Sequence, residues 1–346
     1  MVQIERVCFY VDDSLRWRDW FARILGFHPV ASDRHNHTQT EVVKQGTIEV
    51  QLSSPLSAKS PVAAFLDRHP PGVADLVFRV GNLEAIVDRA LALGAKLLSP
   101  ITASGSLKRC RISALGSLSH TLIENHDAVS VKPSSSPIYR AIDHAVLNVP
   151  AGGLKTAIAW YQSVFGFQPQ QQFTIATDRS SLHSQVLVHP DTGTTLPVNE
   201  PTSETSQIQE FLDANRGAGV QHIALRTDNI LATVDRLRRS GLALISVPKT
   251  YYDRLCKREL NLSPAELDAI ASRQILVDRR PTSPAILLQT FTQPIFAEPT
   301  FFFEIVERRS RWIGGQLQAA EGFGEGNFRA LFEAVEREQI KRGNLK

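Results

Sequence analysis

Apolar and polar positions follow the same order in the two halves of the chain. An apolar run with a charged pair near its start, IERVCFYV, begins at Ile4, and a similar run, IDHAVLNV, begins at Ile142. Both patterns are typical of strands. Each run is followed by an amphipathic segment that closes at a glycine, Gly26 or Gly166. Glycine suits the left-handed position past a helix end, so we predict a strand and a helix at the start of each half.

A third pair of segments repeats later in each half. GVADLVFRVGNLEAIVDRALALGAKLLSP begins at Gly72, and GVQHIALRTDNILATVDRLRRSGLALISVP begins at Gly219. Each predicts a strand, a capped helix and a further strand. All three pairs are separated by nearly the same distance along the chain, about 140 residues, which indicates a duplicated α+β unit of short helices on a mixed sheet.

The joint between the halves is predicted from composition. In HDAVSVKPSSSPIYR, Pro133, three serines and Pro137 disfavour regular structure. We therefore place a linker near residue 135 and expect two domains, residues 1–130 and 131–346.

Two segments of the second half have no counterpart in the first. The insertion TYYDRLCKRELNLSPAELDAIASRQ contains Ser263, Pro264 and Glu266, which together form a helix-start signature. The C-terminal tail, GFGEGNFRALFEAVEREQIKR, predicts a glycine-jointed helix.

Composition narrows the class of protein. The 38 Lys and Arg against 35 Asp and Glu give a net charge of +3, and no basic run is dense enough to indicate nucleic-acid binding. Cys8, Cys110 and Cys256 are too scattered for a disulfide framework or a cysteine-type zinc site, which fits a reducing compartment. The N-terminus lacks the pattern of an export signal, and no apolar run approaches the roughly 18 residues of a membrane helix. We expect a soluble, cytoplasmic protein with no membrane partner.

Histidines on strands point to a metal. Two imidazoles and one carboxylate on one face, with other positions open, suit Fe(II) that binds a chelating substrate and O2 together. His144 lies on the first strand of the second half, His222 on a later one, and alignment of SHTLIEN with FFFEIVER puts Glu304 on the last. The first-half counterparts are Arg6, Asp75 and Thr121. A lone strand histidine is more often a core residue, but two of them with a carboxylate that is costly to bury unless it is paired favour a metal site.

Several motifs resemble one family. IDHAVLNVP, LPVNEP, SQIQEFL, GAGVQHIAL, LLQTFTQP, PTFFFEIVERR and EGFGEGNFRALFE are similar to motifs of the 4-hydroxyphenylpyruvate dioxygenases. The first half resembles the degenerate N-terminal domain of that family. The family belongs to the vicinal-oxygen-chelate superfamily, so the resemblance implies an α+β, glyoxalase-like fold of two tandem halves. Each half would hold paired βαβββ units that form an open barrel, and a C-terminal helix would follow.

The resemblance also assigns roles to residues. It implies that His144, His222 and Glu304 bind one Fe(II) per chain, that O2 is a co-substrate, and that Gln207 and Gln289 assist catalysis. The residues implied to line the substrate pocket are Ser184, Asn199, Gln207, Gln221, Gln289, Phe291 and Phe302, and the last two would hold the substrate ring. The residues implied to close the pocket from the C-terminal helix are Phe323, Gly324, Asn327, Phe328 and Phe332.

The reaction implied is the oxidative decarboxylation and ring hydroxylation of 4-hydroxyphenylpyruvate to homogentisate and CO2. A rival is 4-hydroxymandelate synthase, which uses the same metal site and substrate but hydroxylates the benzylic carbon. The triad does not separate the two, whereas Asn199, Phe291 and Phe302 favour ring hydroxylation. Another metal enzyme of the superfamily is disfavoured by LLQTF and GFGEGNF, and a non-enzymic small-molecule-binding protein is disfavoured by the triad. A homo-oligomer, dimer or tetramer, is expected.

Overall fold

The computed structural model describes the chain except for residues 126–136, 178–179, 257, 259, 261, 281–282, 314, 325, 328–335, 338 and 341–346. The first-half elements are β1 (Val2–Tyr10), α1 (Ser14–Trp20), a π-helical turn η1 (Phe21–Leu25), β2 (His28–His35), β3 (Thr38–Gln45), β4 (Ile48–Pro55), α2 (Pro61–Leu66), β5 (Gly72–Val80), α3 (Leu83–Ala92), β6 (Leu97–Ser104), β7 (Leu107–Ser113) and β8 (Ser119–Asn125).

The second half repeats this order with additions. Its elements are β9 (Ala141–Asn148), α4 (Leu154–Phe165), β10 (Gln168–Ala176), β11 (Ser181–Val188), β12 (Thr195–Pro201), α5 (Gln207–Asn215), β13 (Gly219–Arg226), α6 (Ile230–Arg239), α7 (Lys249–Leu255), α8 (Pro264–Ser272), β14 (Leu276–Asp278), β15 (Leu287–Phe291), β16 (Phe302–Arg308), β17 (Ser310–Ile313) and β18 (Gln316–Ala319). None of the helices described is long and apolar enough to cross a membrane.

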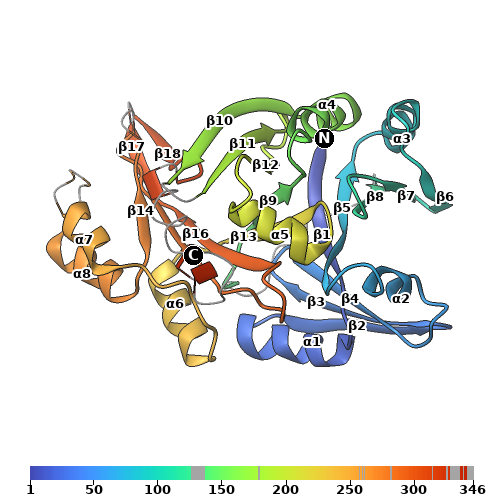
Figure 1. Cartoon of the computed structure of the whole chain (residues 1–346), viewed down its shortest axis with the longest axis horizontal. Coiled ribbons are helices and arrows are strands. Elements are labelled where there is room, and N and C mark those ends of the chain that lie inside the picture. Colours follow the sequence, from blue (N-terminus) through green and yellow to red (C-terminus); the bar gives the residue numbers. More distant parts are fainter. Residues whose placement is uncertain are drawn as a thin grey trace.

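The two halves form sheets of the same topology. The strand orders are β2-β3-β4-β1-β5-β8-β7-β6 and β10-β11-β12-β9-β13-β16-β15-β14, so each sheet consists of two βαβββ units joined through their first strands (Figure 1). The predicted α+β duplication of paired units is therefore confirmed.

The strand register around His144 and Glu304 is the same as the register at the equivalent positions of the first half. Ala224 of β13 lies opposite His144 on β9 and opposite Glu304 on β16. The corresponding first-half residues are Val77, Arg6 and Thr121. A one-residue slip would send every side chain to the other face. The shared register therefore puts His144 and Glu304 on the same face of the sheet as each other.

A buried glutamate starts the same helix in both halves. Glu124 of β8 accepts a hydrogen bond from the backbone N–H of Leu83 at 2.6 Å, and Glu307 of β16 accepts one from that of Ile230 at 2.7 Å. Each carboxylate satisfies an N–H group that a helix start leaves without an intrahelical partner. The starts of α3 and α6 are thus tied to β8 and β16, which occupy equivalent places in the two sheets.

Helices from opposite halves pack against each other in two equivalent places. Arg89 of α3 donates to the carbonyl of Val164 in α4 at 2.8 Å, and Arg236 of α6 donates to the carbonyl of Ile24 in η1 at 3.4 Å. Figure 1 shows α3 beside α4. Buried side chains of both halves form one continuous hydrophobic core. The two sheets are therefore held as a single body.

The helix ends and the helix start predicted from the sequence are confirmed. Gly26 and Gly166 close their helices in the left-handed region at φ 78° and 79°, and Ser263 forms the predicted capping box. The strand predicted after α6 is wrong, because Leu244 makes a single isolated bridge before the insertion begins. Strand β14 takes that edge instead, after the insertion. The β17–β18 hairpin was not predicted. The boundary near residue 130 lies outside the described residues and stays a prediction, as does most of the C-terminal helix.

Candidate metal centre

Three side chains from neighbouring strands converge at the middle of the second sheet. His144 comes from β9, His222 from β13 and Glu304 from β16. The Nε2 atoms of the two histidines lie 3.1 and 3.5 Å from Oε2 of Glu304. One nitrogen or oxygen atom from each residue lies within 4.8 Å of the other two, and all three side chains are almost fully buried.

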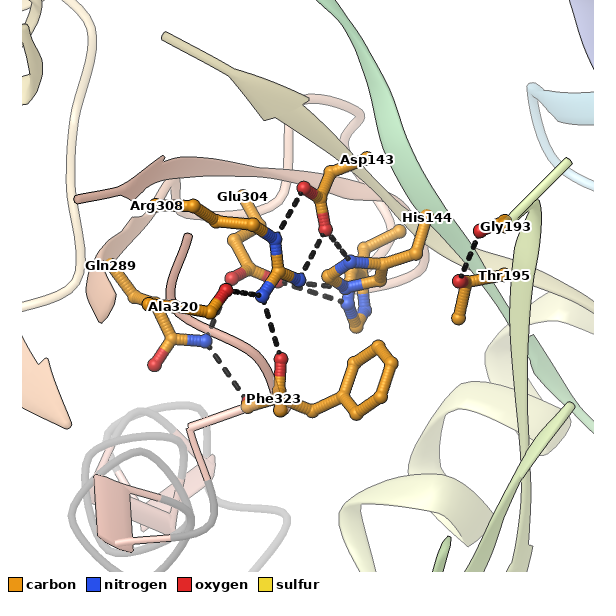
Figure 2. A network of polar contacts seen from close by, with 11 residues as sticks. Asp143, His144, Gly193, Thr195, Gln289, Glu304, Arg308, Ala320 and Phe323 are labelled. Carbon is orange, nitrogen blue, oxygen red and sulfur yellow. Dashed lines mark hydrogen bonds and ion pairs between the residues drawn. The ribbon is translucent and has the colours of Figure 1, made fainter. Parts of the chain in front are cut away.

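The other ring nitrogen of each histidine has its own partner. Nδ1 of His144 lies 3.0 Å from Oδ1 of Asp143, and Nδ1 of His222 lies 3.1 Å from Oε1 of Gln221 (Figure 2 shows the first pair). Both partner oxygens accept hydrogen bonds, which places the ring hydrogen on Nδ1. The Nε2 atoms of both rings are left to face Glu304.

Glu304 is held from its other oxygen. Nε2 of Gln289 donates to Oε1 of Glu304 at 2.9 Å and to the backbone carbonyl of Phe323 at 3.0 Å (Figure 2). Oε2 is thereby the oxygen that faces both imidazoles. One amide therefore orients the carboxylate and contacts the C-terminal segment at the same time.

The electrostatics of the cluster favour an ionised carboxylate. Burial by itself would raise the pKa of Glu304, but His144 and His222 lower that pKa to about 2. Burial would lower the pKa of His144, yet the carboxylates of Glu304 and Asp143 raise that pKa to about 9. Burial lowers the pKa of His222 and the charge of His144 lowers it further, and these effects outweigh Glu304, which raises it.

This donor set fits a divalent metal ion. A buried carboxylate beside two imidazoles whose Nε2 atoms converge on it is what a two-histidine, one-carboxylate site requires, because a metal ion would replace any protons on Nε2. Second partners on Nδ1 are typical of metal-bound histidines. An ion at this point would bind all three groups, whose Nε2 and Oε2 atoms face one another. The three predicted ligands can therefore hold a metal together.

A cavity of about 80 Å³ adjoins the three ligands. Its apolar wall includes Val146, Phe173, Ile175 and Leu182. The site residues predicted from the sequence that line it, besides the ligands, are Ser184, Asn199, Gln207, Gln221, Gln289, Phe291, Phe302 and Phe323. The structure thus brings together side chains from positions 144 to 323 around one small space.

The polar wall is built on two paired strands. Ser184 of β11 lies opposite Asn199 of β12 in the antiparallel register. Nδ2 of Asn199 donates to Oδ1 of Asn148 at 3.2 Å. Gln207 is the first residue of α5, whose start is capped by Ser206. These amide and hydroxyl groups can hydrogen-bond a polar end of a ligand.

Aromatic rings crowd the space beside the ligands. Phe302 stacks on the ring of His222, with centroids 4.8 Å apart, and Phe291 meets Phe302 edge to face at 6.2 Å. Phe323 approaches His144 edge to face at 5.5 Å. A ring-sized ligand can enter between Phe291 and Phe302 only if these side chains separate.

The predicted C-terminal residues reach the site through Gln289. Nδ2 of Asn327 donates to Oε1 of Gln289 at 3.0 Å, and Tyr251 from the insertion donates to Oδ1 of Asn327 at 2.7 Å. Gly324 adopts φ 79°, and a Cβ there would collide with the side-chain amide of Gln289. Glycine is required at that position by both the backbone and the close approach. Phe328 and Phe332 lie outside the described residues.

Sequence reasoning missed two charged residues of this site, Asp143 and Arg308. Arg308 donates from Nε and Nη2 to the two oxygens of Asp143 at 2.7 and 2.6 Å. Burial would raise the pKa of Asp143, but Arg308 and His144 hold that pKa well below its usual range. The adjacency of Asp143 to a predicted ligand was a usable signal, whereas nothing local identified Arg308 as its partner.

Family models match along nearly three quarters of the chain. The model described as "Hydroxyphenylpyruvate dioxygenase, HPPD, N-terminal" matches residues 2–141, and that of the "Glyoxalase/Bleomycin resistance protein/Dioxygenase superfamily" matches residues 141–255. The 4-hydroxyphenylpyruvate dioxygenase of Yarrowia lipolytica is 35% identical, over 99% of this chain and 93% of its own. That of Dictyostelium discoideum is 33% identical over 100% of both chains.

Solved structures show the same architecture. A triple mutant of 4-hydroxymandelate synthase from Streptomyces coelicolor is similar with a TM-score of 0.86 and 26% identity, over 97% of this chain and 98% of the other. A Mn(II)-bound glyoxalase from Novosphingobium aromaticivorans has a TM-score of 0.55 at 13% identity, over 92% and 83% of the two chains, which is a likeness of fold alone.

Proposed function

Because the chain belongs to the 4-hydroxyphenylpyruvate dioxygenase family, we propose that it is an Fe(II)-dependent enzyme that converts 4-hydroxyphenylpyruvate and O2 into homogentisate and CO2. Its place among the oxygenases of the vicinal-oxygen-chelate superfamily follows from the family. The metal, the substrate and the product are the proposal.

The convergence of His144, His222 and Glu304 beside a cavity is the observation that carries this proposal. These three residues would hold an iron ion and would leave other positions open for substrate and oxygen. When bound, the ion would supply the redox chemistry with O2, and the protein would supply orientation and a dry pocket.

The chain's own residues would position the substrate. Ser184, Asn199 and Gln207 can hydrogen-bond its polar end, and Phe291 and Phe302 would hold its ring by stacking, worth about 1 kcal/mol per aromatic pair beyond burial. Phe323 would exclude water above His144. Since a cavity of about 150 Å³ accommodates benzene, the cavity seen here must enlarge when the aromatic substrate enters.

A second candidate is 4-hydroxymandelate synthase activity on the same substrate. The similarity to the Streptomyces coelicolor enzyme over nearly the whole chain favours it. Identity with the dioxygenases is higher, at 35% for the Yarrowia lipolytica protein, and favours homogentisate as the product. The two reactions differ in the carbon that is hydroxylated, so the product distinguishes them.

The test is reconstitution with Fe(II) under anaerobic conditions, followed by 4-hydroxyphenylpyruvate and O2, with CO2 counted and the aromatic product identified. Homogentisate with one CO2 per turnover is the expected result. 4-Hydroxymandelate would move the chain to the second candidate, and turnover that does not depend on iron would contradict both.

A matched variant tests the ligand assignment. Glu304→Gln keeps the size of the side chain and its contact with Gln289 but removes the negative charge, so we expect loss of tight Fe(II) binding and of turnover. Glu307→Gln, three residues along the same strand, is the control and should bind Fe(II) as the wild type does. Equal Fe(II) affinity of Glu304→Gln and wild type would exclude Glu304 as a ligand.

A further inference from the structure

We propose that Arg308 is a positioning residue that couples docking of the C-terminal segment 320–323 to metal binding by His144. This inference rests on the proposed metal centre. The guanidinium of Arg308 would hold the backbone of this segment and the carboxylate of Asp143, the hydrogen-bond partner of His144, in a fixed position relative to each other.

One side of the guanidinium faces the metal centre. Its Nε and Nη2 atoms make a two-point contact with the carboxylate of Asp143, at 2.7 and 2.6 Å. The same carboxylate accepts from Nδ1 of His144 at 3.0 Å. Arg308 has 14% of its side chain exposed and Asp143 has 5%, so solvent barely competes for these bonds.

The other side faces the C-terminal segment. Nη1 of Arg308 donates to the carbonyls of Ala320 and Gly322 at 3.0 and 2.9 Å, and the guanidinium carbon lies 5.9 Å from the ring centroid of Phe323. That ring is the one that meets His144 edge to face. Figure 2 shows the guanidinium of Arg308 between Asp143 and Ala320, with Phe323 below it.

The planar shape of the guanidinium turns these contacts into coupling. Its donors are fixed relative to one another, so a group that holds Nη1 also limits the directions of Nε and Nη2. When the segment is docked, Arg308 therefore holds the carboxylate of Asp143 in the position in which that carboxylate orients the imidazole of His144. Coupling of this kind is reciprocal, so a bound metal ion must favour the docked segment by the same factor. An ammonium group cannot reproduce it, because it lacks the fork.

The first half supplies an internal comparison. Glu5 and Asn125 occupy the positions that correspond to Asp143 and Arg308. Glu5 pairs instead with Arg79 of the neighbouring strand at 2.7 Å. Among the described residues, Asp143 thus pairs with an arginine that also holds a following segment, whereas Glu5 pairs with an arginine of the neighbouring strand.

The experiment compares Arg308→Lys and Asp143→Asn with wild type, and uses Arg309→Lys as the matched control. Arg309 is the next residue, and its guanidinium pairs with Glu307 and Glu266 instead of the metal centre. Affinity for Co(II) and the visible absorption of bound Co(II) report on coordination. Hydrogen exchange of segment 320–323, with and without Co(II), reports on docking.

We expect Arg308→Lys and Asp143→Asn to lower Co(II) affinity by about tenfold to a hundredfold, as outer-partner substitutions at metal sites do. We also expect Co(II) to slow exchange in segment 320–323 of wild type and Arg309→Lys but much less in Arg308→Lys. Unchanged affinity, or equal protection of the segment in Arg308→Lys, would overturn the coupling. Failure of the wild type itself to bind Fe(II) or Co(II) would contradict the proposed function, so the two failures are distinguishable. Should Arg308→Lys not fold, Asp143→Asn, which removes the charge on which Arg308 acts, decides the matter by the same two measurements.

Discussion

His120, on a strand of the first half, should make the folded protein sensitive to acid. This side chain on β8 is completely buried. Nδ1 lies 3.3 Å from the carbonyl of Leu76, which can only accept, so Nδ1 carries the ring hydrogen. Nε2 lies 2.9 Å from the hydroxyl of Tyr161 in α4 and accepts from it. Burial lowers the pKa of His120 to about 3.

The magnitude follows from linkage between protonation and folding. An unfolded histidine has a pKa of about 6.5, so at about pH 5 the unfolded chain binds a proton at this position and the folded protein does not. The neutral imidazole contributes fully to the free energy of unfolding above about pH 6.5. This contribution falls by about 1.4 kcal/mol per pH unit as the pH drops towards the pKa of the folded state. From neutral pH to about pH 5 the loss is about 2 kcal/mol.

Urea unfolding of wild type and His120→Asn, both free of metal, measures this effect at about pH 7 and about pH 5. Asparagine keeps a donor for the carbonyl of Leu76 but cannot take up a proton, and it leaves the Tyr161 hydroxyl without its acceptor. We expect the variant to be less stable at neutral pH by about 1–3 kcal/mol, and the gap to narrow by about 2 kcal/mol in acid. Other groups titrate alike in both proteins. A gap that stays constant with pH would refute the reasoning, because it would mean that His120 is protonated or solvated in the folded state.

Three further outcomes are expected. Phe9→Ala should lower the free energy of unfolding by about 3–5 kcal/mol in a single transition, because Phe9 of the first half meets Phe301 of the second half edge to face at 4.9 Å. Two separate transitions in calorimetry would contradict a shared core, and Val30→Ala, at an exposed position, is the control. Gly324→Ala should speed hydrogen exchange around residue 324 and raise KM, because its Cβ would collide with the amide of Gln289; wild-type values for both would contradict the close approach. Ser263→Ala should cost about 1 kcal/mol in thermal or urea unfolding, because it removes a capping box, and an unchanged midpoint would show that α8 contributes nothing to global stability.

Repeats and periodicity determined much of this protein from the sequence. Gly26 and Gly166 marked equivalent helix ends because a left-handed residue is a local requirement that glycine meets. The positions of His144, His222 and Glu304 followed from aligning the halves, since alternation along a strand decides which face a side chain occupies. Their roles as ligands remain a prediction, although the register of the sheets brings them together.

Only the tertiary structure decided which distant residues meet. The partnership of Arg308 with Asp143, 165 positions earlier, and the contact of Tyr251 with Asn327 depend on how β16, β9, the insertion and the tail pack. The strand expected after α6 was lost for the same reason, because β14 occupies the sheet edge that Leu244 reaches in a single bridge. Local preferences for helix, strand and turn depend on neighbouring residues, so they recur at equivalent positions of both halves. Contacts between elements depend on the path of the whole chain, which spacing along the sequence does not record.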